Sequence, residues 1–180
     1  KLISAAGSVI YDSTAAGGST SIATGKTNAK WQTTMFGTAG GNFLFMVNGE
    51  DAPIYYNGSA FTTPSLAGVT ATDIVHVAAH QRRLFFVFND SLTFGYLPIV
   101  SVAGTVDIGG LCSKGGYIQA IGSWTRDGGA GPEDLFVAIT SEGECVIYAG
   151  NDPSSATAWS LVGVFNIGNP IGRRCVEKVG

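Results

Sequence analysis

The chain has only two histidines, and their spacing is the first feature that could bind a metal ion. His76 and His80 lie four residues apart, so on a helix both imidazoles would face one metal. The run Ile74–Ala79 alternates like a strand instead. At roughly 3.3 Å per residue, the two rings would then be about 13 Å apart. The glutamate of a zinc-protease motif is also missing between them. We therefore predict ordinary strand histidines and no metal site.

Three acids gather in segment 127–134, where Asp127, Glu133 and Asp134 flank a glycine-rich stretch. Such a group could hold a hard cation such as calcium, whose ligands are oxygens. The segment lacks the alternating acids of a known calcium loop, and a solvated hairpin loop is the simpler interpretation. We predict a loop over Arg126–Asp134 without a bound ion.

A second acidic pair, Glu142 and Glu144, leaves an enzyme hypothesis open. A glycosidase needs two carboxylates across a pocket, and aromatic platforms would hold the sugar. The acids at 133–134 and this pair lie between Trp124 and Trp159. All four acids fall in or next to predicted turns. A glycan-binding or glycan-hydrolysing protein acting on host surface polysaccharide is therefore the alternative, and a structural protein is the first hypothesis.

Other motifs of site chemistry are incomplete. Gly25-Lys26-Thr27 looks like the end of a phosphate-binding loop, but Thr20 stands where that loop needs its first glycine. We expect Gly25 to form a turn. No serine lies in Gly-x-Ser-x-Gly, and neither histidine has a nearby acid in sequence to suggest a triad, although a triad assembled in space stays open. The sequence predicts no catalytic, cofactor-binding or metal-binding residue, and no cofactor.

The three cysteines, Cys112, Cys145 and Cys175, lie about thirty residues apart. Their odd number and the absence of a C-x-x-C pair argue against a disulfide framework and against a zinc site. We predict buried free thiols, the usual state of a free cysteine.

The composition indicates packed sheets with tight turns. The chain has 26 glycines and 45% hydrophobic residues but only 13% charged residues. A net charge of -3 provides no basic field for a phosphate backbone, which argues against a dedicated nucleic-acid reader. No apolar run reaches the roughly 18 residues that a membrane-spanning helix needs.

Strands are predicted where β-branched and aromatic residues run together, because helical periodicity is weak throughout. The clearest strands are Asn42–Val47, Ile74–Ala79, Arg83–Phe88, Gly116–Ile121, Leu135–Ile139 and Glu144–Tyr148. Dipeptides that tolerate positive φ lie between strands, as hairpins require. These dipeptides are Asn48-Gly49, Asn57-Gly58, Asn89-Asp90 and Glu142-Gly143. We predict antiparallel connections, because parallel strands would need long crossovers.

The strands repeat. Leu44-Phe45, Leu84-Phe85 and Leu135-Phe136 each open an apolar strand, at spacings of 40 and 51 residues. A second set of matching tripeptides falls in the strand after the turn: Val9-Ile10-Tyr11, Pro53-Ile54-Tyr55 and Val146-Ile147-Tyr148. Four antiparallel strands per unit with this period have the dimensions of a β-propeller blade.

We therefore predict an all-β, β-propeller-like chain of about three complete blades and partial ones. The units are the end of a preceding blade at 1–28, blades at 29–70, 71–112 and 113–170, and the first strand of a following blade at 171–180. The first unit is expected to hold strands near Ser8–Tyr11 and Thr20–Thr24, and the last to begin with Arg173–Val179. Rings usually have roughly four to eight blades, so we predict a fragment, or blades supplied by residues or chains not shown. A long sandwich of hairpins is the competing fold.

Several motifs after residue 70 resemble known proteins. The segment Asp152–Trp159 resembles the Asp-box turn of sialidase propellers without its glycine, and such a turn is structural. The stretch Ala79-His-Gln-Arg-Arg-Leu-Phe-Phe86 resembles one found in virion proteins of tailed phages, especially the tail nozzle or hub proteins of short-tailed phages. Further stretches look like the same group, and together they span about residues 71–180: Ser123–Leu135, Ser141–Gly143, Asp152–Ala156, Trp159–Gly163 and Pro170–Arg174.

The resemblance implies a structural protein and no enzyme. It implies a propeller within a ring-shaped tail component of the virion, commonly sixfold, through which the genome leaves the capsid. The expected partners are other phage tail proteins and further copies of the chain, with transient passage of DNA and no specific DNA binding. Members of the family are longer and carry platform domains that are not seen here.

Overall fold

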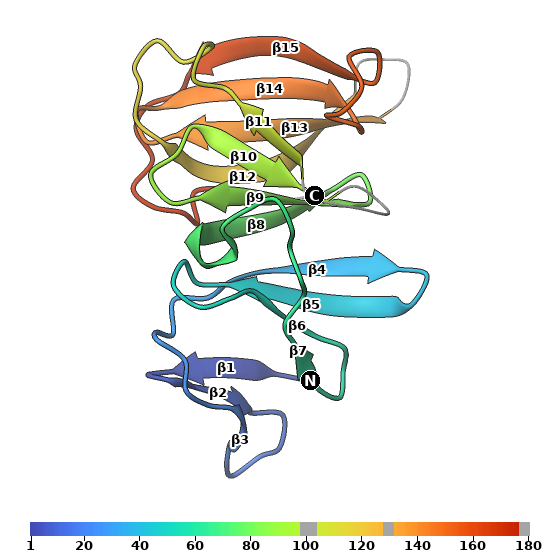
Figure 1. Ribbon diagram of the computed structural model, residues 1–180, viewed down its shortest axis with the longest axis vertical. Helices are drawn as coiled ribbons and strands as arrows, with labels where there is room; N and C mark the ends of the chain where they lie inside the picture. Colours follow the sequence, from blue (N-terminus) through green and yellow to red (C-terminus); the bar gives the residue numbers. More distant parts are fainter. Residues whose placement is uncertain (98–103, 128–131, 177–180) are drawn as a thin grey trace.

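The computed structural model describes residues 1–97, 104–127 and 132–176 as a succession of small antiparallel sheets (Figure 1). Helix in these residues is limited to one 3-10 turn, Ala71–Asp73. Across the described part of the chain, no helix has the length and apolar character needed to cross a bilayer. The predicted all-β class with antiparallel strands is confirmed.

Each sheet is a meander, in which hydrogen-bonded neighbours follow one another in the sequence. Sheet 1 contains β1 (Ile3–Ala6), β2 (Val9–Asp12) and β3 (Thr20–Ala23). Sheet 2 contains β4 (Gln32–Thr38), β5 (Gly41–Val47), β6 (Ile54–Tyr56) and β7 (Phe61–Thr62). Sheet 3 contains β8 (Ile74–His80), β9 (Arg83–Phe88), β10 (Thr93–Tyr96) and β11 (Gly104–Asp107). Sheet 4 contains β12 (Ile118–Asp127), β13 (Pro132–Thr140), β14 (Glu144–Gly150) and β15 (Trp159–Asn166).

The turn residues chosen from the sequence do adopt the left-handed conformation that hairpins need. Gly49, Gly58 and Gly143 have φ of 77°, 97° and 76°, and Asp90 has φ of 46°. At Gly143 a Cβ would also collide with the backbone of Gly168, so this turn excludes a side chain for two reasons. The short turns keep successive strands antiparallel.

The core consists of the layers between sheets, because alternate residues of a strand point to opposite faces. On β9, Leu84 and Phe86 pack toward sheet 2, while Phe85 and Val87 pack toward sheet 4. All four side chains are at most 2% exposed. Full burial of such a side chain contributes about 1.5–3 kcal/mol, so a central sheet is stabilised from both faces.

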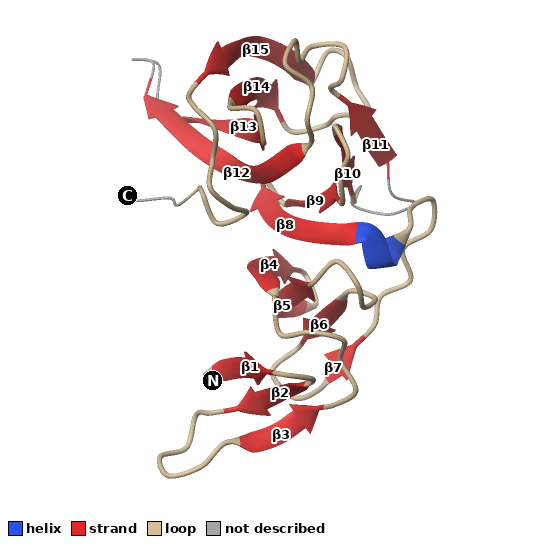
Figure 2. Ribbon diagram, turned by 90° about the vertical axis from the view of Figure 1, so that its left-hand side faces the viewer, coloured by secondary structure: helices blue, strands red, loops and turns tan. Residues whose placement is uncertain are grey.

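The sheets lie one after another along the molecule, with sheet 1 at one end and sheet 4 at the other (Figure 1). Their first strands lie on one side: β8 contacts β4 on one side and β12 on the other (Figure 2). The last strands of sheets 2 and 3, β7 and β11, lie farther from this side, and β15 of sheet 4 lies at the end of the molecule, three strands away from β12 (Figure 2). Sheets 2 to 4 therefore fan out from their first strands.

Three sequence predictions need correction. Sheet 1 has a third strand, β1, which the sequence analysis did not predict. Its residues are mostly small, and only two residues separate it from β2. The predicted loop Arg126–Asp134 is shorter, because β12 continues to Asp127 and β13 begins at Pro132. The predicted strand Arg173–Val179 is absent over residues 173–176, whose backbone makes no ladder pairing, and residues 177–179 lie outside the described part.

Candidate functional site

A group of partly buried polar contacts joins sheet 3 to sheet 4, and both histidines belong to it. His76 and His80 lie on β8, as predicted, and each reaches across to sheet 4. The His76 Nε2 atom lies 3.1 Å from the carbonyl oxygen of Ile121. A carbonyl oxygen can only accept, so this nitrogen carries the proton and donates it. His76 thus ties the first strands of the two sheets together.

His80 makes two contacts of this kind and is 2% exposed. Its Nε2 atom lies 3.1 Å from the carbonyl oxygen of Gly150, and its Nδ1 atom lies 2.9 Å from the Ser123 hydroxyl oxygen. The carbonyl requires a proton on Nε2, and in the neutral imidazole Nδ1 then accepts the hydroxyl proton. We call His76, His80, Ile121, Ser123 and Gly150 the histidine clasp.

A serine hydroxyl that donates to a histidine resembles half of a catalytic triad, and no sequence spacing paired these two residues. The second nitrogen of His80 is oriented by a backbone carbonyl, where a triad would use a carboxylate. The ring is also enclosed by aromatic rings, with centroids of Phe85, Phe136 and Trp159 between 5.8 and 6.2 Å away. The geometry is that of a buried link between sheets.

Burial affects the other histidine too. His76 has a lowered pKa because desolvation disfavours its charged form, and the nearby positive charge of Arg173 acts in the same direction. The hydrogen bond to Ile121 opposes these effects. Its Nδ1 atom is buried and has no hydrogen-bond partner among the described residues. The clasp therefore contains one imidazole that resists protonation.

The predicted Asp-box region forms a second link between the same two sheets. Asp152 accepts hydrogen bonds from the Ser154 amide and hydroxyl, which lower the pKa of its carboxyl group. The same carboxylate lies 3.0 Å from Arg83 on β9. Trp159, at the end of this loop, is 9% exposed and stacks on Tyr148 at 5.1 Å. The loop thus attaches sheet 4 to sheet 3.

The turn between β8 and β9 carries backbone strain that the sequence did not reveal. Gln81 and Arg82 both have positive φ, 41° and 68°, where Asn-Gly is the usual choice. Non-glycine residues in this region cost of order 1–3 kcal/mol each and persist where surrounding structure holds them. The side-chain amide nitrogen of Gln81, Nε2, donates to the backbone carbonyl oxygen of Asp134 at 2.9 Å. Gln81 therefore adds a third link to sheet 4.

The acids considered for glycan cleavage do not converge. Glu133 pairs with Arg126 at 2.8 Å, and Asp134 accepts from Thr125 at 2.5 Å, near one end of β13. The other two acids lie near the opposite end of this strand, roughly 25 Å away at about 3.3 Å per residue. A retaining or inverting glycosidase holds its carboxylates within about 5–9.5 Å. Acids from opposite ends of β13 are therefore too far apart for such a pair.

Glu144 is held by hydrogen bonds to the connection between sheets 3 and 4. Its carboxylate accepts from the Ser113 amide, the Ser113 hydroxyl and the Lys114 amide at 2.8–3.0 Å. These bonds, led by the Lys114 amide, lower the pKa of the carboxyl group. The side chain thereby fastens the connection between sheets 3 and 4 to the β13–β14 turn. Among the described residues, no cluster of three or more potential metal ligands occurs.

The remaining motifs are also structural. Gly25 has φ of 70°, as expected of a turn, and Thr27 donates its amide and hydroxyl to the carboxylate of Asp51 at 2.9 Å. These groups connect sheets 1 and 2. Of the cysteines, only Cys145 is buried, and burial raises the pKa of its thiol to about 11.

The prediction of three buried thiols is therefore wrong for two of them. Cys112 is half-buried and Cys175 is exposed. Cys175 lies in the segment after β15, outside the strands of the described residues.

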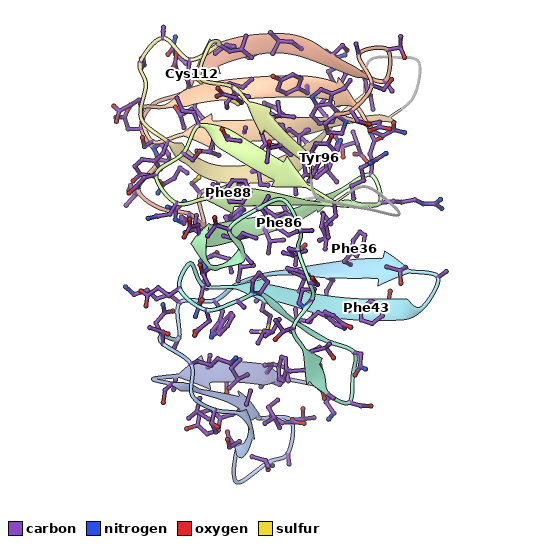
Figure 3. The ribbon with its side chains drawn as sticks, in the orientation of Figure 1. Phe36, Phe43, Phe86, Phe88, Tyr96 and Cys112 are labelled. Carbon is purple, nitrogen blue, oxygen red and sulfur yellow. The ribbon has the colours of Figure 1, made fainter. Side chains whose placement is uncertain are left out.

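A hollow opens between sheets 2 and 3, at the tip of the β4–β5 hairpin. A pocket of 820 Å³ is lined by Phe36, residues 37–40 of the hairpin, Arg82 and Leu97. A smaller pocket of 270 Å³ also touches Phe36 and lies against aromatic and aliphatic side chains: Phe43, Phe45, Tyr55, Pro64 and Leu84. Figure 3 shows Phe36 and Phe43 at this hairpin, with Phe36 toward sheet 3. We call these two pockets the hairpin groove.

The sequence analysis missed both the clasp partners and the groove. Ser123, Gly150 and Ile121 reach the histidines only through contacts between sheets, so no local spacing marks them. The groove had one possible signal, the aromatic residues at 36, 43 and 45 near the glycine-rich tip. Comparison with known proteins adds nothing to these observations: no family model, no curated protein and no solved structure matches this chain.

Proposed function

We propose that this chain is a structural component of a phage virion tail, of the nozzle or hub kind. Its sheets would act as blades of a β-propeller within a ring-shaped assembly that surrounds the channel for genome ejection. Further copies of the chain and other tail proteins would complete the ring. The DNA would pass through the channel without specific binding.

One observation carries the proposal. The first strands of sheets 2, 3 and 4 are neighbours, with β8 between β4 and β12, and the sheets fan out from them. Propeller blades have this relation, since each buries its faces on the next blade around a central channel. A sandwich of two long sheets would instead place alternate hairpins in the same sheet.

The polar chemistry fits a passive scaffold. The histidine clasp and the Arg83–Asp152 pair engage neighbouring sheets, and Glu144 fastens the connection between two of them. The net charge of -3 favours a conduit that does not hold DNA tightly. These features, together with the motif resemblance around Ala79–Phe86, favour the structural hypothesis over glycan cleavage.

The test is to locate the protein in the virion. Antibodies against the purified chain, labelled with gold, should decorate the tail of virions of the phage that encodes it. In parallel, the purified protein should release no reducing sugar from host surface polysaccharide. Labelling of the capsid alone, or sugar release that is lost in Glu133→Gln, would contradict the proposal.

A further inference from the structure

The hairpin groove combines an apolar pocket with a cation at its rim. Phe36 pairs with Phe43 across the β4–β5 ladder, and Phe45 pairs with Tyr55, so these rings share the face toward sheet 3. Phe43 and Tyr55 meet edge to face at 5.4 Å. The smaller pocket of 270 Å³ between them is large enough for an aromatic or branched side chain.

Arg82 is the one charged residue among the described residues that line the two pockets. It is exposed, and no ion pair joins it to any described acid. Three of the four hairpin turns predicted from the sequence have glycine at the left-handed position, and the turn at 89–90 has Asp90 there. The turn at 81–82 likewise has a non-glycine residue, Arg82, in a conformation that glycine adopts without strain.

We propose that the hairpin groove binds an extended segment of another protein, in which an apolar side chain is followed by a carboxylate. The apolar side chain enters the pocket between Phe36 and Tyr55, and the carboxylate pairs with Arg82. Buried aromatic or aliphatic anchors and complementary rim charges are how interfaces gain affinity and specificity. This inference concerns a surface that the proposed scaffold role does not use.

The exposed apolar side chains of the described residues do not offer this ligand. Among the described residues, none of the exposed large apolar side chains is next to an aspartate or glutamate in the sequence. A second copy is therefore a poor occupant. Among the described residues that line the smaller pocket, Tyr55 supplies the one polar side-chain group, so a sugar would find few hydrogen bonds there.

The experiment is a titration of the isotope-labelled chain followed by amide NMR shifts. The probe is a capped tetrapeptide, Gly-Phe-Glu-Gly, compared with Gly-Phe-Gln-Gly and Gly-Ala-Glu-Gly. The first peptide should shift the amides of Gly37, Gly40 and Leu97 with a Kd of about 1 mM. The glutamine peptide should bind about three- to fivefold more weakly, as for one exposed ion pair, and the alanine peptide should not saturate.

Two variants make the result specific. Arg82→Gln should bind the glutamate and glutamine peptides equally, while Arg126→Gln, at an arginine that pairs with Glu133, should leave the preference intact. The proposal is overturned if shifts fail to saturate by about 10 mM. It is also overturned if the glutamate preference survives in Arg82→Gln, or if maltohexaose shifts the groove amides more strongly than the peptide.

Discussion

The two faces of sheet 3 differ sharply. Toward sheet 4, Phe85 lies within a closed aromatic layer, where its ring centroid is 4.6 Å from that of Phe136 and 5.9 Å from that of Trp159. Toward sheet 2, packing is tight around Phe86 but opens at the β4–β5 hairpin into the groove beside Arg82. Polar links also concentrate on the sheet 4 side.

This difference shows how one repeat produces two kinds of interface. Between sheets 3 and 4, large aromatic residues fill the layer and polar side chains join the two sheets across it. Where the β4–β5 hairpin extends past sheet 3, the same type of aromatic residue lines a surface hollow. The closed layer and the hollow therefore differ in the length of the hairpin and in how completely side chains fill each layer.

The largest predicted effect contrasts phenylalanines in these two places. Phe136→Ala should lower the free energy of unfolding by about 3–5 kcal/mol, because it leaves a cavity in a closed layer. Phe36→Ala, at the half-buried groove position, should cost about 1 kcal/mol. Urea unfolding followed by tryptophan fluorescence measures both. Equal losses would mean that the layers are packed alike.

Removal of the clasp should have the next largest effect. His80→Ala leaves the Gly150 carbonyl without this donor and opens space among aromatic rings, so we expect a loss of about 2–4 kcal/mol. Ser123→Ala deletes one hydroxyl and should cost about 1 kcal/mol. If both substitutions lowered the free energy of unfolding in urea by the same small amount, His80 would not link the sheets.

Acid should weaken the sheet 3–sheet 4 interface through His76. Its pKa is lowered in the folded chain, so the unfolded chain binds the proton more readily. The stabilisation is therefore fully present above the ordinary pKa of 6.5 and is lost as the pH falls below it. His76→Gln retains a donor for Ile121 but does not titrate. Its unfolding free energy should vary less between pH 7 and pH 5 than that of the unaltered chain, and an unchanged slope would exclude His76 as the cause.

The smallest predicted effect is a gain. Arg82→Gly should raise the free energy of unfolding by about 1 kcal/mol or less, because glycine adopts positive φ without strain. The same variant should lose the glutamate preference of the hairpin groove. Thermal unfolding monitored by circular dichroism gives the stability. A loss of stability would show that the arginine is kept for packing and not for binding.

The sequence predicted the strands well because they are encoded locally. Apolar runs such as Arg83–Phe88 coincide with β9, and four turns were marked by residues that tolerate positive φ. β1 was missed because its small residues give no pattern, and the turn at 81–82 was missed because Gln-Arg is unlike ordinary turn residues. The burial of the three cysteine thiols could not be predicted locally either, because it depends on which sheet packs over each of them.

The candidate sites were beyond local patterns. His80, Ser123 and Gly150 come from three strands of two sheets, and they meet only when those sheets pack. The acids that were near one another in sequence are separated by the length of β13, since an extended strand spans about 3.3 Å per residue. Proximity along a β chain is therefore a poor guide to proximity in a site.

Cryo-electron microscopy of the purified protein tests the central claim most directly. The account predicts a ring-shaped particle in which sheets 2, 3 and 4 are consecutive blades, with β4, β8 and β12 nearest the axis. The closed layer between sheets 3 and 4 should be the best ordered. A compact particle in which hairpins of these sheets merge into two facing sheets, with no central axis, would contradict it.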